Sequence, residues 1–173
     1  GFGNIARAII TPLLDKKFVS SIEINIEDDG TIIMENDGNG IDVAKHPEYD
    51  LWIPEMIFGH LRTSTNYNKE EKKIVGGKNG FGFKLVLIWS TYGKIETIDH
   101  VRGLKYVQEF KDNLNEICKP TITKVKSSKP YTKITFKPDY NRFNSPIGIT
   151  SDMFSLLKKR TFDVAAVTDH SIK

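Results

Sequence analysis

Strand-like and helix-like segments follow one another in this chain without a regular β-α-β rhythm. Residues 20–27 (SSIEINIE) alternate isoleucine with polar residues, which is typical of a half-buried strand. Asp28-Asp29-Gly30 has the composition of a turn and joins this segment to a second strand-like run, residues 31–36. The order favours an α+β sandwich with a largely antiparallel sheet over a doubly wound parallel sheet.

The rest of the chain also contains both helix-like and strand-like segments. Residues 53–61 are expected to form a short helix with Pro54 in its first turn. A long polar loop follows, and a buried helix is expected after it. The predicted segments in chain order are a helix at 79–90, strands at 94–99, 104–110 and 131–138, and a helix at 151–167.

The last predicted helix has a plausible start and an apolar stripe. Ser151 is expected to be its N-cap, because a serine hydroxyl can accept from the backbone N–H two or three residues later. The apolar residues recur at helical spacing, which predicts one buried face. The expected members of that face are Phe154, Leu157, Phe162 and Ala165.

Composition narrows the class of protein. The 173 residues fit one domain or a domain plus a fragment, and 39% hydrophobic with 27% charged residues is ordinary for a globular protein with a core. A net charge of +3 is too small to argue nucleic-acid binding by itself. The single cysteine, Cys118, excludes an internal disulfide framework and a multi-cysteine metal site. No apolar run approaches the about 18 residues of a membrane span, so no membrane partner is expected.

Four glycines fall within residues 76–82, directly before the predicted helix at 79–90. Residues without a Cβ let backbone N–H groups approach a ligand, and a helix start adds unpaired N–H groups, so this segment could bind phosphate. A flexible loop before a core helix explains the same residues. The segment is not a Walker A loop, because Lys84 is followed by Leu85, and it lacks the β-α-β frame of a dinucleotide site.

A second glycine-broken segment, ENDGNGI, ends the strand-like run at Asn36. The amide oxygen of Asn36 can accept from an exocyclic amine, although a turn in which Asn36 caps the strand end is the more ordinary explanation of this motif alone. Thr135 lies within a later strand-like run, and its meaning depends on whether that strand lies beneath Asn36.

The three segments occur in an order that resembles the GHKL ATPases. NDGNGI is followed by GHLRTSTNY and KKIVGGKNGFGFKL, and then by YTKITFKPD. Residues 53–85 in particular are similar to the ATPase domain of eukaryotic-type (type IIA) DNA topoisomerase II. The resemblance runs from about Ser20 to the end. It implies a two-layer α/β sandwich of the Bergerat type, with a mixed, mostly antiparallel sheet and helices on one face, as one ATP-binding domain over residues 1–173.

The resemblance also implies roles for individual residues. Asn36 would accept a hydrogen bond from the adenine amine, and Thr135 would assist through water. The neighbouring carboxylate, Asp37, would not bind adenine. The rest of the nucleotide would be contacted by side chains of the lid and its flanks and by backbone amides. Ile41 and Ile57 would line the adenine pocket, Ser64, Thr65 and Asn66 would touch ribose and phosphates, and Gly77, Lys78, Asn79, Gly80, Phe81, Gly82, Phe83 and Lys84 would wrap the triphosphate.

The first residues depart from the family pattern Glu-x-x-x-Asn-Ala-x-Asp. No glutamate precedes Glu23, so the general base that activates water is not found in this chain. Asn4 matches the asparagine that binds Mg²⁺ and nucleotide, or it is a surface residue or N-cap. Arg7 stands where the family has aspartate, and Pro12 disturbs a long helix. This region is therefore expected to be altered or truncated, and the transducer domain is expected to be absent.

The expected function is that of an ATP-binding and ATPase fragment of a type IIA DNA topoisomerase, with ATP and Mg²⁺ as cofactors and weak or no activity alone. In the full enzyme, ATP-driven homodimerisation would close a gate for DNA strand passage, and DNA would be contacted through the whole enzyme. The alternatives are a nucleotide-binding module without turnover, a histidine kinase and a plain interaction domain. The resemblance places the protein in the nucleus if it is eukaryotic, and otherwise in the cytoplasm, including viral replication sites.

Overall fold

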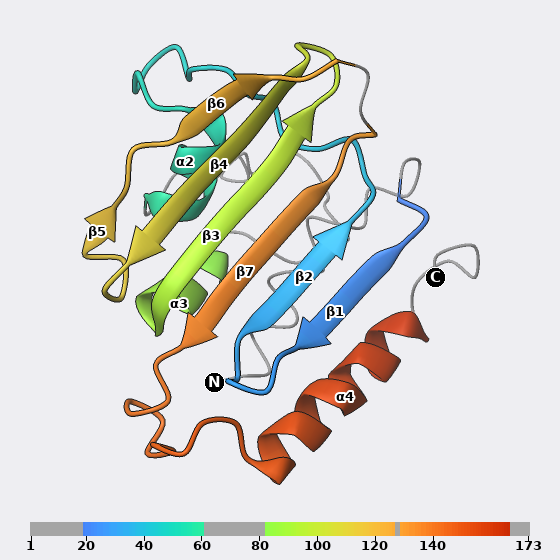
Figure 1. The fold of residues 1–173 in the computed structure, drawn as a ribbon, viewed down its shortest axis with the longest axis vertical. Helices are drawn as coiled ribbons and strands as arrows, with labels where there is room; N and C mark the ends of the chain where they lie inside the picture. The colour runs from blue at the N-terminus through green and yellow to red at the C-terminus, as the bar shows by residue number, and fades with distance from the viewer. Residues whose placement is uncertain (1–18, 61–81, 127–128, 167–173) are drawn as a thin grey trace, which may run out of the picture.

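The computed structural model describes residues 19–60, 82–126 and 129–166. Within these residues seven strands form one sheet with the order β1-β2-β7-β3-β4-β5, and β6 also pairs with β4 (Figure 1). Each pairing of these strands is antiparallel. The strands are β1 (Ile22–Ile26), β2 (Ile32–Asn36), β3 (Ser90–Asp99), β4 (Leu104–Lys111), β5 (Glu116–Ile117), β6 (Thr121–Lys124) and β7 (Thr132–Pro138).

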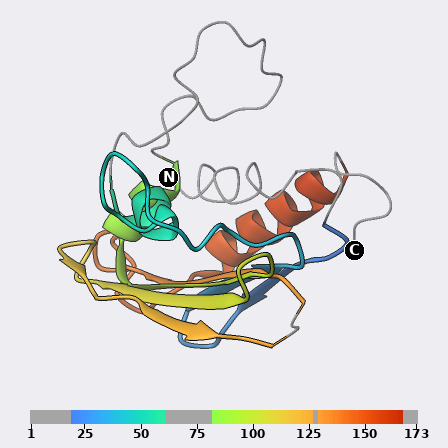
Figure 2. The same ribbon diagram turned by 90° about the horizontal axis from the view of Figure 1, so that it is seen from above.

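Three described helices cover one face of this sheet and leave the other face open (Figure 2). They are α2 (Ile53–Gly59), α3 (Gly82–Ile88) and α4 (Ser151–Ala165). The arrangement confirms the predicted α+β sandwich with helices on one face of an antiparallel sheet. Within the described ranges, no helix has both the length and the apolar character needed to cross a membrane.

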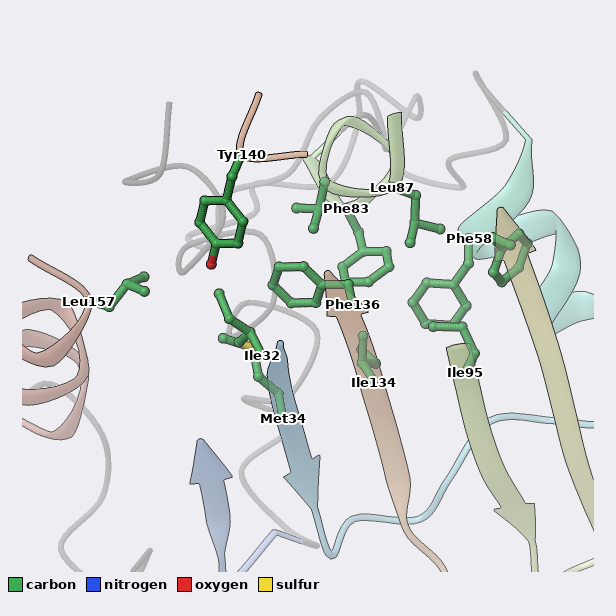
Figure 3. Close-up of a cluster of buried hydrophobic side chains, with 12 residues drawn as sticks. Ile32, Met34, Phe58, Phe83, Leu87, Ile95, Ile134, Phe136, Tyr140 and Leu157 are labelled. Atoms are coloured by element: carbon green, nitrogen blue, oxygen red, sulfur yellow. The ribbon is translucent and has the colours of Figure 1, made fainter. Parts of the chain in front are cut away.

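The hydrophobic core lies between the sheet and these helices. Phe83 and Leu87 extend from α3 toward Phe136 of β7 and Ile95 of β3 (Figure 3). Phe58 of α2 meets the Phe83 ring edge-on, with ring centroids 4.9 Å apart. Burying one such side chain stabilises the fold by about 1.5–3 kcal/mol, so this contact holds α2 and α3 together above the sheet.

The opposite face of the sheet carries charged side chains that pair across the strands. Lys133 of β7 lies 3.3 Å from Glu35 of β2, and Lys94 and Lys105 lie 3.0 Å and 3.6 Å from Glu96. Such exposed pairs contribute little stability individually, about 0–1 kcal/mol. Their importance is that they keep this face in water, which is why the strands alternate apolar and polar residues.

The predicted boundary between the second helix and the next strand is wrong. The helix was expected to reach residue 90, but α3 ends at Ile88 and β3 begins at Ser90, four residues before the predicted strand. Gly93 explains this tight connection, because a Cβ there would lie 2.3 Å from the Leu87 side chain. Helix α3 therefore packs onto the strand that follows it at close range. The short strands β5 and β6 were not predicted.

Helix α4 starts as expected in place but with a different cap. Thr150, rather than Ser151, is the N-cap: its backbone is extended, and its hydroxyl accepts from Met153 N at 3.2 Å. Ser151 is already helical and so cannot cap. The predicted buried stripe is also wrong, since Leu157 is buried but Phe154 and Phe162 are 45% and 65% exposed.

These half-exposed rings border an apolar groove between α4 and strands β1 and β2. The groove has a volume of about 370 Å³. Its lining includes Ile24, Ile26, Met34, Phe154 and Phe162.

Candidate functional site

A row of buried polar side chains crosses three neighbouring strands at one end of the sheet. Asn36 of β2 lies opposite Thr132 of β7, and Thr132 lies opposite Thr97 of β3. Their exposed fractions are only 5%, 6% and 0%. Directly opposed residues point to the same face, so all three project to the side that carries the helices. We call Asn36, Thr132 and Thr97 the polar rung.

Two backbone groups fix the orientation of the Asn36 amide. Its nitrogen donates to the Thr132 carbonyl at 3.3 Å, and its oxygen accepts from Gly38 N at 3.0 Å. Reversing the amide would place its nitrogen against an N–H and its oxygen against a carbonyl, so only one orientation is satisfied. The amide oxygen has a second lone pair, and this lone pair can accept from a ligand.

The chain after Asn36 crosses the end of the sheet as a glycine strap, residues 38–43. A Cβ on Gly38 would lie 2.8 Å from the Asn36 amide oxygen, and one on Gly40 would lie 2.0 Å from the carbonyl oxygen of Ile98. Gly40 also has a φ of +75°. Gly38 is therefore required by its close approach to the Asn36 side chain, and Gly40 by its close approach to backbone and by its left-handed conformation. Ile41 N then donates to the Thr97 hydroxyl at 2.9 Å, which ties the strap to the rung.

Asp99, at the end of β3, anchors the far end of the strap. Its carboxylate accepts from Val43 N at 2.9 Å, from Val101 N at 3.0 Å, and from the backbone and guanidinium of Arg102 at 3.0 Å and 2.8 Å. Burial disfavours the charge, but these hydrogen bonds outweigh burial and hold the pKa of Asp99 below its ordinary value. The charged carboxylate thus fixes the strap against β3.

Asp37 has a structural role at the start of the described chain. Its carboxylate accepts from Ser20 N and Ser21 N, each at 2.8 Å, and from the Ser20 hydroxyl. Burial works against the charge, yet the hydrogen bonds from Ser20 and Ser21 leave the pKa of Asp37 lowered. Its oxygens are used by the segment before β1, which leaves Asn36 as the side chain that faces the site.

The structure does not bring Thr135 to Asn36, and its predicted role is corrected here. Thr135 lies opposite Ile33, three residues along β7 from the rung, and it points to the charged face of the sheet. Thr132 occupies the place that Thr135 was expected to take. The signal was present in the sequence, because Thr132 shares the alternation phase of the buried Ile134 and Phe136.

Other predicted residues lie on the two helices above the sheet. Ile57 on α2 is 39% exposed, and Gly82 is the exposed first residue of α3. The Phe83 side chain packs in the hydrophobic core. Lys84 is only 2% exposed, and burial lowers the pKa of its ammonium group.

Part of the predicted site lies outside the described residues and stays a prediction. The residues concerned belong to the first segment and to the lid. They are Asn4, Ser64, Thr65, Asn66, Gly77, Lys78, Asn79, Gly80 and Phe81. In the segments that the structure does describe, no group of three or more His, Cys, Asp or Glu side chains could hold a metal ion. The groove beside α4 contains none of the predicted nucleotide-binding residues.

Comparison with known proteins gives a consistent picture. No family model matches the chain. It is 48% identical over 143 residues to DNA topoisomerase 2 of Acanthamoeba polyphaga mimivirus, covering 83% of this chain and 11% of that protein. It is 44% identical over 144 residues to DNA topoisomerase 2 of Saccharomyces cerevisiae, covering 83% and 10%. The chain thus spans about a tenth of the length of the relatives it matches.

The fold has a clear counterpart among solved structures. The ATPase region of Saccharomyces cerevisiae topoisomerase II superimposes with a TM-score of 0.88 at 40% identity, over 94% of this chain and 44% of that one. An antiparallel sheet with helices on one face and a polar, glycine-bounded end defines the class, an α+β sandwich of the GHKL type. Within that class, the chain belongs to the ATPase-region family of type IIA DNA topoisomerases.

Proposed function

We propose that residues 1–173 form the nucleotide-binding part of a type IIA topoisomerase ATPase domain, and that adenine binds against the polar rung. The rung carries this proposal. Asn36 is buried, its amide is held in one orientation, and its oxygen has a lone pair to spare. A purine offers an apolar ring and an exocyclic amine that donates. Ile41, partly buried beside the rung, and the side-chain-free strap give that ring a place to lie.

The triphosphate would be bound by the second glycine segment and Lys84. The backbone amides of residues 77–84 are the predicted phosphate ligands, and most of them lie outside the described residues. Lys84 supports this assignment, because its buried amine lies in the first turn of α3, directly after the glycine segment, and an ammonium group makes charge-assisted hydrogen bonds to phosphate.

Mg²⁺ would accompany the nucleotide and offset the charge of its phosphates when bound. The residue predicted to contact it is Asn4, whose amide oxygen is a suitable ligand for a hard cation. Phosphate oxygens would supply further ligands.

Glu23 lies on the side of the sheet that faces away from the polar rung. Glu23 is the first glutamate of the sequence, and it lies exposed on β1, opposite Glu35 on the charged face of the sheet. The rung faces the other way, so Glu23 cannot reach a nucleotide bound there. Within the whole enzyme, ATP binding would dimerise two such domains and close a gate for DNA passage, in the nucleus or the cytoplasm.

The Asn36→Ala variant tests the adenine assignment. We expect ATP and ADP to bind about tenfold to a hundredfold more weakly, and to the same extent, because the base is common to both and one hydrogen bond from a buried partner is lost. Isothermal titration calorimetry on the 173-residue chain measures both affinities, with circular dichroism to confirm folding.

The matched control is Asn25→Ala, which removes an exposed asparagine from β1. Both nucleotides should bind it as they bind the unaltered chain. A folded Asn36→Ala protein with undiminished ADP affinity would contradict adenine binding at the rung.

A further inference from the structure

We propose that Thr97 determines base selectivity at the polar rung by taking the hydroxyl proton of Thr132. Thr132 is then left as a hydrogen-bond acceptor toward the ligand, so the site takes a 6-aminopurine and disfavours a 6-oxopurine. This inference rests on the proposed function, since it presumes that a purine nucleotide binds at the rung.

The hydrogen bonds of Thr97 leave one arrangement of its single proton. Its hydroxyl lies 3.0 Å from the Tyr131 carbonyl, which can only accept, so Thr97 donates there. The Ile41 N–H, at 2.9 Å, occupies one of its two lone pairs. The Thr132 hydroxyl lies 3.2 Å away and faces the remaining lone pair. With the Thr97 proton directed at the Tyr131 carbonyl, we infer that Thr132 donates to Thr97.

The consequence for the site follows from the proton count of Thr132. A threonine hydroxyl has one proton, and here that proton points along the rung and away from the ligand. The oxygen of Thr132 keeps lone pairs that can only accept. Beside it, the Asn36 amide cannot reverse, because Gly38 N and the Thr132 carbonyl hold its two ends. Both oxygens of this edge thus suit an amine that contacts them directly.

A 6-oxo group meets the opposite situation. Its oxygen would face two oxygens that have no proton to offer, which leaves polar groups unpaired in a buried place. Thr97 is the most deeply buried residue of the rung, with no exposed surface. Its hydroxyl is hydrogen-bonded to the hydroxyl of Thr132. It acts through Thr132 and so is a positioning residue.

The test compares ATP with inosine triphosphate, which has a 6-oxo group in place of the amine. On the unaltered chain we expect ATP to bind at least about tenfold more tightly than inosine triphosphate. In Thr97→Val the Thr132 proton is released and can turn to the ligand, so the ratio of the two affinities should fall by about tenfold. Thr97→Ser keeps the hydroxyl and should restore the ratio.

A double-mutant cycle separates this role from a structural one. Thr132→Val removes the hydroxyl that Thr97 controls, so adding Thr97→Val to it should leave the ratio where Thr132→Val put it. Thr123→Val, an exposed threonine on β6, serves as the control and should change neither affinity.

Two outcomes distinguish failure of this inference from failure of the proposed function. If the unaltered chain binds no adenine nucleotide, the proposed function fails and this inference fails with it. If it binds ATP, but folded Thr97→Val weakens both nucleotides equally or the two changes add in the cycle, then Thr97 only supports the structure and this inference alone is overturned.

Discussion

A glycine with a positive φ lies at each end of strand β2, but the two glycines have different surroundings. Gly30 precedes β2 with a φ of +80°, and Gly40 follows it with a φ of +75°. At the first end, the Tyr140 hydroxyl donates to the Gly30 carbonyl at 2.7 Å and its ring covers the turn. At the second end, the strap rests on the backbone of β3, and Ile41 N donates to Thr97 of the polar rung at 2.9 Å. One glycine turn closes the core, whereas the other borders the proposed nucleotide site.

The neighbours of the two glycines explain the difference. A Cβ on Gly30 would meet Tyr140 ring atoms at 2.7 Å, and a side chain can turn aside. A Cβ on Gly40 would meet the Ile98 carbonyl oxygen at 2.0 Å, and that oxygen belongs to a central strand of the sheet. We infer that the site end is held by backbone against backbone, which keeps the rung in a fixed geometry.

The largest expected effect comes from replacing these glycines with alanine. Gly40→Ala should destabilise the domain by about 3 kcal/mol or more, because left-handed strain and a clash with backbone combine. Gly30→Ala should cost about 2 kcal/mol, since Tyr140 can give way. Urea unfolding measures both changes.

Gly148→Ala is the control for strain without a clash. Gly148 has a φ of +96°, yet a Cβ there would have nothing within 4 Å, so a loss of about 1 kcal/mol is expected. Nucleotide affinity should fall only in Gly40→Ala. Equal losses at positions 30, 40 and 148 would show that the backbone contact at the site end contributes nothing.

A smaller effect is expected when the anchor of the strap loses its charge. Asp99→Asn should lower the free energy of unfolding by about 2 kcal/mol at pH 7, because the hydrogen bond to Arg102 is no longer charge-assisted on both sides. The folded pKa of Asp99 is lowered, so its contribution is present above the ordinary pKa of about 4 and is lost as the pH falls through the folded value.

Denaturant unfolding at a series of pH values measures this linkage. The stability difference between Asp99→Asn and the unaltered protein should narrow below about pH 4. Asp28→Asn, at an exposed turn position, should stay within about 0.5 kcal/mol of the unaltered protein throughout. A difference that does not change with pH would argue against a charged anchor.

The smallest effect is expected at the closed end of β2. Burial raises the pKa of Tyr140 to about 12, so its hydroxyl keeps its proton and donates to Gly30 across the neutral range. Tyr140→Phe removes this bond and should cost about 1 kcal/mol in thermal or urea unfolding. ATP affinity should not change, and a parallel loss of affinity would mean that the two ends of β2 are coupled.

Much of the fold follows from alternation in the sequence. The isoleucines at 22, 24 and 26 place β1 on the core with its charged residues outward, and the antiparallel class follows from the order of the segments. The boundary near residue 89 was misplaced because an apolar run such as FKLVLIWS does not show where a helix ends. Only the Gly93–Leu87 approach does that, and it is a tertiary contact.

Only part of the candidate site could be predicted from the sequence, because the rest depends on tertiary contacts. Asn36 could be selected from its glycine turn, but its partner Thr132 lies 96 residues further along the chain. Alternation shows which residues share a face, and this should have favoured Thr132 over Thr135. It does not show that β7, the last strand, lies between β2 and β3. Thr97 was therefore missed, because its importance comes only from that strand order.

The face of the sheet that carries the paired charges is a suitable place to attach a fluorescent probe. Thr135 is three residues from Thr132 on the same strand, yet its side chain lies on the solvent side among these ion pairs. A fluorophore attached to a cysteine at that position, with Cys118 replaced by serine, would sit within one strand of the ligand without entering the core. The fluorescence of that probe would then change when a nucleotide binds on the other face of strand β7.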